Sequence, residues 1–218
     1  MRLLALITLL VGISACGPLQ QTTILSTSLD LATDLAGFDT DDTSPDPRSG
    51  LSREMIENAP QDLMLFAPVS EDDASLLARV TENNGYVTWA EDRGIAIITQ
   101  NGLVAGTRGL GNDLMGADLS VVYNALVSGQ GRYARVHDYI GGNDAIVRAR
   151  FECQVQTIRD DVLEIYGQRR NVRLVGEGCA GRAGQFSNLY WIASSGQIWQ
   201  SRQWISAPVG EIDIQMLR

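Results

Sequence analysis

The chain has 218 residues, with 17 basic side chains against 26 acidic ones, a formal net charge of −9 and a hydrophobic content of 44%, which is ordinary for a globular domain. Every basic residue is an arginine and the only histidine is His137, which excludes a P-loop, a Schiff-base lysine and a multi-histidine metal site. The acidity disfavours nucleic acid as a partner, because binding that polymer depends on clustered cations, and the composition favours a scaffold or binding module without metal or cofactor.

The N-terminus has the pattern of a bacterial lipoprotein signal. Residues 3–13 form an apolar run of about ten residues, too short for a helix to cross a bilayer of roughly 30 Å. The run ends in hydrophobic, small, small, Cys at positions 13–16, which is the lipobox pattern. We expect removal of residues 1–15 and acylation of Cys16, which would anchor the protein without a transmembrane helix. Because Gly17 rather than aspartate follows, we expect the outer membrane, facing the periplasm. A plain secretory signal is the alternative.

Residues 16–50 are predicted to be a lipidated N-terminus and polar spacer. Apolar side chains at positions 25, 29, 31, 35 and 38 recur at near-helical intervals and indicate a possible short helix. The acidic, proline-containing stretch 39–47 is typical of a solvated spacer. A second helix is predicted from Ser52, a favourable N-cap, to Pro60, which stops it.

Residues 51–218 are predicted to form one β-rich domain. Asn84-Gly85 and Asn101-Gly102 are turn dipeptides, and the reversal at 92–94 resembles them. Strands at this interval indicate an antiparallel meander. We predict a helix over 116–128 and strands over 63–67, 75–81, 86–91, 95–99, 103–108, 133–140, 145–158, 162–167, 171–178, 186–193, 197–205 and 211–217.

Two predicted strands are apolar on both faces, at residues 95–98 and 189–192. Successive side chains of a strand point to opposite sides of the sheet, so both sides must be covered there. The expected fold is therefore mainly β: an antiparallel, curved or barrel-like sheet with a few short helices packed against it, covering its second face.

Two cysteines remain besides the lipidated one, Cys153 and Cys179. An even pair in an oxidising periplasm predicts a disulfide, and two buried free thiols are the alternative. Two cysteines and one distant histidine are too few ligands for zinc.

Catalytic patterns are weak. The Gly-x-Ser-x-Gly elbow of α/β hydrolases is missing from the sequence, and Cys153 lies mid-strand, which is unfavourable for a nucleophile paired with His137. Arg169, Arg170 and Arg173 are a weak candidate anion site, since acids nearby balance them. Glycosidase-type paired carboxylates are the one enzymatic class that composition leaves open. Their candidates fall in predicted turns: Glu71, Asp72, Asp73, Asp160 and Asp161.

The C-terminal half carries a more specific pattern. Residues 188–192, then 194–204 with the Ser201-Arg202-Gln203 motif, then Pro208 and the alternation over 211–217, resemble the YjbF/GfcB family of bacterial lipoproteins. The stretch 101–104 with Thr107, Gly109, Leu110 and Leu114 resembles the central hairpin of that family, and Arg53 and Ile56 its N-terminal helix. The resemblance covers the chain from about residue 50, together with the lipobox.

The resemblance implies an outer-membrane lipoprotein associated with exopolysaccharide or capsule secretion, without established catalytic activity, and a barrel-like sheet with helices. It supplies motif positions without a known role: Asn188, Trp191, Ser201, Arg202 and Gln203. For Arg202 we predict stacking on a tryptophan and a pair with a buried acid.

Three functions follow from these observations. The first is a non-enzymatic accessory to polysaccharide export, acting as a scaffold or glycan-binding protein, whose partners are the membrane through its lipid anchor, other export proteins of the envelope and the polysaccharide. The second is a carrier of lipid or another apolar ligand in a half-open barrel. The third, least favoured, is a polysaccharide-modifying enzyme with paired carboxylates. Glycan contacts would use exposed aromatic side chains, with candidates Trp89, Trp191, Trp199 and Trp204.

Overall fold

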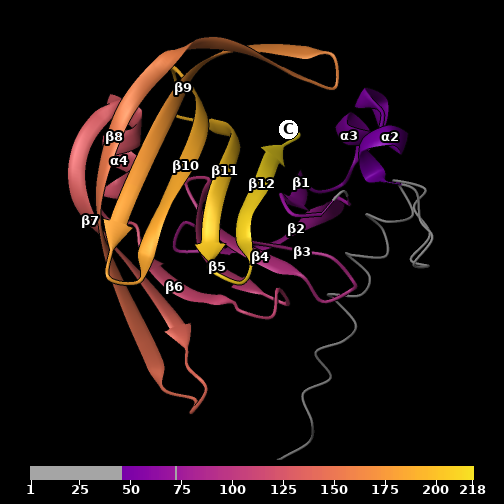
Figure 1. Cartoon of the computed structure of the whole chain (residues 1–218). Helices are drawn as coiled ribbons and strands as arrows, with labels where there is room; N and C mark the ends of the chain where they lie inside the picture. Colours follow the sequence, from indigo (N-terminus) through magenta and orange to yellow (C-terminus); the bar gives the residue numbers. More distant parts are fainter. Residues whose placement is uncertain (1–45, 72) are drawn as a thin grey trace, which may run out of the picture.

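The structure is a computed structural model that describes residues 46–71 and 73–218 (Figure 1). Cys16, the helix predicted within 25–38 and Asp72 lie outside the described residues. Within them, no helix is long and apolar enough to cross a membrane.

In the part of the chain that the structure describes, three short helices accompany the sheet: α2 Pro47–Gly50, α3 Arg53–Asn58 and α4 Val122–Ser128. Ser52 caps α3 as predicted, because its side chain accepts a hydrogen bond of 3.2 Å from the backbone N–H of Met55. The strands are β1 Leu63–Pro68, β2 Ser75–Asn83, β3 Tyr86–Ala90, β4 Ala96–Gln100, β5 Leu103–Arg108, β6 Leu114–Asp118, β7 Gln130–Ile140, β8 Ile146–Ile165, β9 Gln168–Gly181, β10 Gly184–Ala193, β11 Ile198–Ser206 and β12 Gly210–Met216.

All twelve strands join in one antiparallel sheet in the order β5-β4-β3-β2-β1-β12-β11-β10-β9-β8-β7-β6. The sheet curls until its two end strands approach each other. There Thr107 of β5 accepts a hydrogen bond of 3.0 Å from the backbone N–H of Leu114 in β6, so a side chain links the two ends. The result is a nearly closed barrel, which confirms the predicted fold class (Figure 1).

Three predicted boundaries are wrong. The helix predicted over 116–128 begins only at Val122, because residues 116–118 pair with β7 as part of strand β6. β8 continues through Asp160 and Asp161 with a register shift between Thr157 and Arg159. Arg169 and Arg170 also lie inside a strand, β9. Charged pairs are not strand breakers here, because β8 and β9 pair with each other along this whole length.

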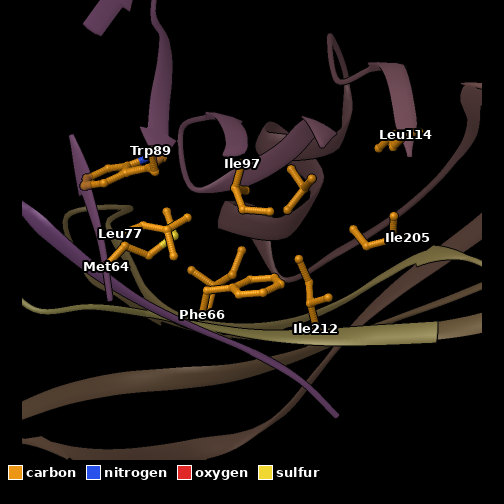
Figure 2. Close-up of a cluster of buried hydrophobic side chains, with 10 residues drawn as sticks. Met64, Phe66, Leu77, Trp89, Ile97, Leu114, Ile205 and Ile212 are labelled. Atoms are coloured by element: carbon orange, nitrogen blue, oxygen red, sulfur yellow. The ribbon is translucent and has the colours of Figure 1, made fainter. Parts of the chain in front are cut away.

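Packed apolar side chains fill the interior of the barrel. In one of its clusters, Met64, Phe66 and Leu77 point toward Ile97 and Ile212 from strands on several sides (Figure 2). A second cluster brings α4 against interior residues of β8 to β10. The interior of the barrel is therefore a packed hydrophobic core at these clusters.

The outer face of β1 is also covered. Leu63 and Leu65 alternate with the inward Met64 and Phe66, and they pack in a separate cluster with α3 and with Ile165 near the end of β8. The β8–β9 ribbon arches over the barrel toward α3 (Figure 1). A covered second face was expected, but the expectation that helices provide it is incomplete, because the ribbon contributes as well.

Candidate functional site

A buried ion pair lies inside the barrel between β7 and β9. Nη1 of Arg135 is 2.8 Å from Oε2 and 3.1 Å from Oε1 of Glu177, and both side chains are at most 1% exposed. Ionised groups this deeply buried need both a counter-charge and hydrogen bonds. The pair is the centre of the largest group of interacting polar side chains that we find among the described residues.

Three further donors saturate the carboxylate of Glu177. Tyr133 donates at 2.5 Å, Asn188 at 2.7 Å and Tyr190 at 3.0 Å. Burial alone would raise the pKa of Glu177, but the charge of Arg135 and these hydrogen bonds outweigh it and hold the pKa below its usual value. Glu177 is therefore ionised at neutral pH, and its oxygens are fully engaged.

His137 continues the same network. Nε of Arg135 donates to Nε2 of His137 at 2.9 Å, which assigns the ring proton to Nδ1. Nδ1 lies 3.0 Å from the hydroxyl of Tyr139, which itself donates to the carbonyl of Ile205 at 2.6 Å. Burial, with a contribution from the charge of Arg135, lowers the pKa of His137 to about 3, so the ring is neutral.

Aromatic rings enclose this histidine. Its ring lies 5.9 Å from Trp204 and 5.8 Å from Phe186 in stacked arrangements, and Phe151 meets it edge-on at 5.6 Å. A general base needs a free nitrogen within reach of substrate. Both nitrogens of His137 are occupied within the protein, so the network serves the architecture of the barrel.

Cys153 and Cys179 lie directly opposite each other in β8 and β9, with Cα atoms 4.1 Å apart, and the structure joins them in a disulfide. Both are buried, next to Glu177. The two sulfurs and a carboxylate resemble a metal-ligand set. The sulfurs are joined and the carboxylate is saturated, however, so these atoms are not available to a metal ion.

Ser201 and Gln203 of the motif are buried, and the side chain of Gln203 links two strands. Oε1 of Gln203 accepts from the backbone N–H of Val104 at 2.9 Å, and its Nε2 donates to the carbonyl of Gly102 at 3.0 Å and to Ser201 at 2.9 Å. Gly102 has φ of +81°, and a Cβ there would lie 2.9 Å from Cβ of Ile198. The side chain of Gln203 thus ties β11 to the β4–β5 hairpin at a point of close approach.

Asn188 has a similar role. Besides its bond to Glu177, its Oδ1 accepts from the backbone N–H of Trp204 at 2.7 Å. β10 and β11 pair with each other only from Leu189 and Arg202 onward. Asn188 therefore replaces a backbone contact where β11 turns away from β10.

Arg202 points away from the interior and forms a two-bond pair with Asp213 of β12, at 2.8 and 2.7 Å. Asp213 is 42% exposed, so the expected pairing is found but not with a buried acid. The prediction that Arg202 stacks on a tryptophan is also wrong. Another arginine does so: the guanidinium of Arg170 lies 3.4 Å from the ring of Trp199. Alternation along β11 places Arg202 on the outside.

The four tryptophans differ in access. Trp89 is buried and donates to Thr99 at 2.9 Å, and Trp204 stacks on Phe186. Trp199 is covered by Arg170. Trp191 is half-buried, and its N–H donates to the carboxylate of Asp161 at 3.3 Å.

The surface candidates are only partly brought together: Asp160 and Asp161 of β8 line one open groove with Arg173 of β9, which is the cross-strand partner of Asp160. Arg170 alternates with Arg169 along β9, so these two side chains lie on opposite faces, and Arg173 donates to the carbonyl of Val127 at the end of α4. Asp161 pairs with Arg159 at 3.0 Å. Glu71 lies in the turn after β1, as predicted.

Sequence reasoning missed the buried network. Its signal was present in one predicted strand, where Tyr133, Arg135, His137 and Tyr139 alternate and therefore share a face. Four hydrogen-bonding side chains on one strand face predict a buried polar network when that face is inward. Glu177 and Tyr190, from other strands, had no local signal.

Fold and site define a barrel-like β protein whose buried polar residues maintain its architecture. A family model described as "Group 4 capsule polysaccharide lipoprotein gfcB, YjbF" matches residues 27–217, and the chain belongs to this family. Membership implies association with the cell envelope. The fold is similar to the crystal structure of the hypothetical lipoprotein YmcC from Escherichia coli, with a TM-score of 0.69 and 19% identity over 77% of this chain and 89% of that one. No curated protein matches the chain in sequence.

Proposed function

We propose that this chain is a non-enzymatic lipoprotein of the outer membrane that faces the periplasm and assists the export or assembly of capsule or exopolysaccharide. The family match over residues 27–217 carries the proposal. The lipobox at positions 13–16 supports anchoring through Cys16. Its partners would be other envelope proteins of polysaccharide export, with the polysaccharide itself as a further ligand.

The buried network supports a non-enzymatic role. Hydrolysis of a glycan by paired carboxylates requires one acid that holds a proton near neutral pH. Glu177, the most deeply buried acid of the network, has a lowered pKa and four partner side chains that include Arg135. It therefore has neither the proton nor the access that such an acid needs.

The packed interior supports a scaffold over a carrier. A carrier needs an apolar hollow of several hundred Å³ inside the barrel. The interior positions on β1, β5 and β12 are instead occupied by side chains in mutual contact, such as Phe66, Val104 and Ile212, all at most 1% exposed. A scaffold acts through its outer surface.

Deletion of the gene is the decisive experiment. We expect less polymer at the cell surface, while incubation of purified protein with that polymer leaves its chain length unchanged by size-exclusion chromatography. Shortening of the polymer, lost on removal of one Asp or Glu, would establish an enzyme instead. Lipid that co-purifies with the protein and is displaced by apolar probes would establish a carrier.

The anchor is tested separately. Cys16→Ser should abolish acylation, seen by mass spectrometry of the intact protein, and should move the chain from the membrane fraction to the soluble periplasmic fraction. A wild-type protein without acyl chains, together with a variant that still fractionates with the outer membrane, would refute lipidation at Cys16.

A further inference from the structure

The hairpin that joins β7 and β8 projects beyond the barrel (Figure 1). Its end carries exposed apolar side chains. Its three large apolar side chains are 49% (Ile140), 71% (Ile146) and 51% (Val147) exposed. Scattered single apolar residues on a surface need no explanation, but a contiguous group at a projecting point marks an interaction site. We call residues 140–147 the tip.

The tip is apolar on both faces. Ile140 is the cross-strand partner of Ile146, and Tyr139 is the partner of Val147. These two pairs lie on opposite faces of the ribbon because successive side chains alternate. A flat partner would cover only one of them, so the occupant has to enclose the tip.

The end of the tip is polar and ordered. Gly141 and Ala145 close the turn with a backbone hydrogen bond of 2.8 Å, and the N–H of Asp144 donates to Gly141 at 3.0 Å. Asp144 is exposed in this turn, and no ion pair to it is found within 46–71 and 73–218. The hairpin thus presents apolar sides and an anionic end in a fixed geometry.

We propose that the tip inserts into a cleft of another envelope protein, with apolar walls for Ile140, Ile146 and Val147 and an arginine or lysine at its base for Asp144. The proposal rests on the proposed accessory function. Insertion into a bilayer would bury the Asp144 carboxylate in hydrocarbon, which is costly. A symmetric tip-to-tip contact between two copies would bring two Asp144 carboxylates together.

Photo-cross-linking in cells tests the contact directly. The full-length lipidated chain carries a photoreactive benzoylphenylalanine at position 146, and the control carries it at position 162, where Val162 at the other end of β8 is 47% exposed. We expect position 146 alone to cross-link to one protein other than this chain, identified by mass spectrometry. Asp144→Asn should lower that yield by about tenfold, as loss of a central interface contact does. Asn tolerates the φ of +59° at this position, so the turn remains.

A second experiment measures function. The triple variant Ile140→Thr, Ile146→Thr, Val147→Thr keeps β-branched side chains but removes the apolar surface. It should lower surface polymer to the level of the deletion strain. The matched control Ile158→Thr, Val162→Thr changes two exposed apolar residues of the same strand, each 47% exposed, and should leave the polymer unchanged.

The remaining outcomes overturn the proposal. They are cross-links only to lipid or to a second copy, cross-linking that Asp144→Asn leaves unchanged, or, where deletion of the gene lowers the polymer, normal polymer in the triple variant. Tip-dependent flotation of the Cys16→Ser chain on vesicles of phosphatidylethanolamine and phosphatidylglycerol, stronger with Asp144→Asn, would assign the tip to a bilayer. If deletion of the gene leaves the polymer unchanged, the proposed function fails, while the cross-linking result still decides the contact.

Discussion

Arg135 and Glu177 form an ion pair inside the barrel in which each side chain is at most 1% exposed, with Nη1 and Oε2 2.8 Å apart. Removing two charges from water is costly, and the attraction between them repays that cost only when the remaining hydrogen bonds are satisfied. Here Tyr133, Asn188 and Tyr190 satisfy the carboxylate. Loss of one partner alone should therefore be far worse than loss of both charges.

Glu177→Gln should lower the free energy of unfolding by about 3–5 kcal/mol, because it leaves the buried guanidinium of Arg135 without its counter-charge. The measurement is equilibrium unfolding in urea. Glu152→Gln is the control: Glu152 is 75% exposed in its pair with Arg150, and its loss should cost at most about 1 kcal/mol. The double variant Arg135→Gln, Glu177→Gln should recover part of the loss. Equal losses of stability in Glu177→Gln and in the control Glu152→Gln would contradict this account.

His137 should make stability fall as the pH falls. Its pKa is about 3 in the folded protein and 6.5 as the ordinary value, so between these pH values the unfolded chain binds a proton that the folded chain does not. The free energy of unfolding should decrease by about 1.4 kcal/mol per pH unit below pH 6.5. Glu177, whose folded pKa is also lowered, adds to the decrease only below its ordinary value of 4.5.

The measurement is urea unfolding between pH 5 and pH 7. His137→Gln keeps an acceptor for Arg135 and a donor for Tyr139 but does not titrate, so its stability should be nearly flat over this range. A slope that persists in His137→Gln would show that other groups cause it.

The fold was predictable because its signals are local. Asn84 and Asn101, both with positive φ, mark turns that the dipeptides Asn84-Gly85 and Asn101-Gly102 predict. The alternation of apolar side chains likewise indicates strands over most of their lengths. The two-faced run at 95–98 is packed on both sides, as the pleat of a strand requires. In the run at 189–192, however, the outward Leu189 and Trp191 are only half-buried, so the expectation of a covering layer is wrong there.

The site was less predictable because its partners are distant in sequence. Arg135 and Glu177 are 42 residues apart, and only the register of β7, β8 and β9 brings them together. The predicted strand bounds place breaks at Asp160-Asp161 and at Arg169-Arg170, whereas both pairs lie inside the arching β8–β9 ribbon. Pairing between β8 and β9 keeps these charged residues in strands, and no local sequence pattern indicates that pairing.

Cys153 and Cys179 should be linked in protein isolated from an oxidising compartment. They are 26 residues apart, and closing such a loop contributes roughly 3–4 kcal/mol in the chain-entropy model. Non-reducing peptide mapping should recover the linked pair, and Cys153→Ser with Cys179→Ser should unfold at lower urea concentration. Dithiothreitol should destabilise the wild type and not this double variant. Two thiols freely alkylated in the unfolded, unreduced protein would refute the link.

The neighbouring motif residues Gln203 and Arg202 should differ sharply in their effect on stability. Gln203→Leu leaves the buried N–H of Val104 and the carbonyl of Gly102 without that partner, at a cost of about 1–3 kcal/mol for each unsatisfied group. Arg202→Leu breaks an outer pair with a half-exposed Asp213, which should cost about 1 kcal/mol or less. Urea unfolding of both variants measures the difference, and surface polymer in the same strains measures function.

If Arg202→Leu abolishes polymer export while its stability is unchanged, Arg202 lies in a contact with a partner and is more than a structural residue. If Gln203→Leu is as stable as the wild type, the fastening of β11 to the β4–β5 hairpin does not stabilise the barrel.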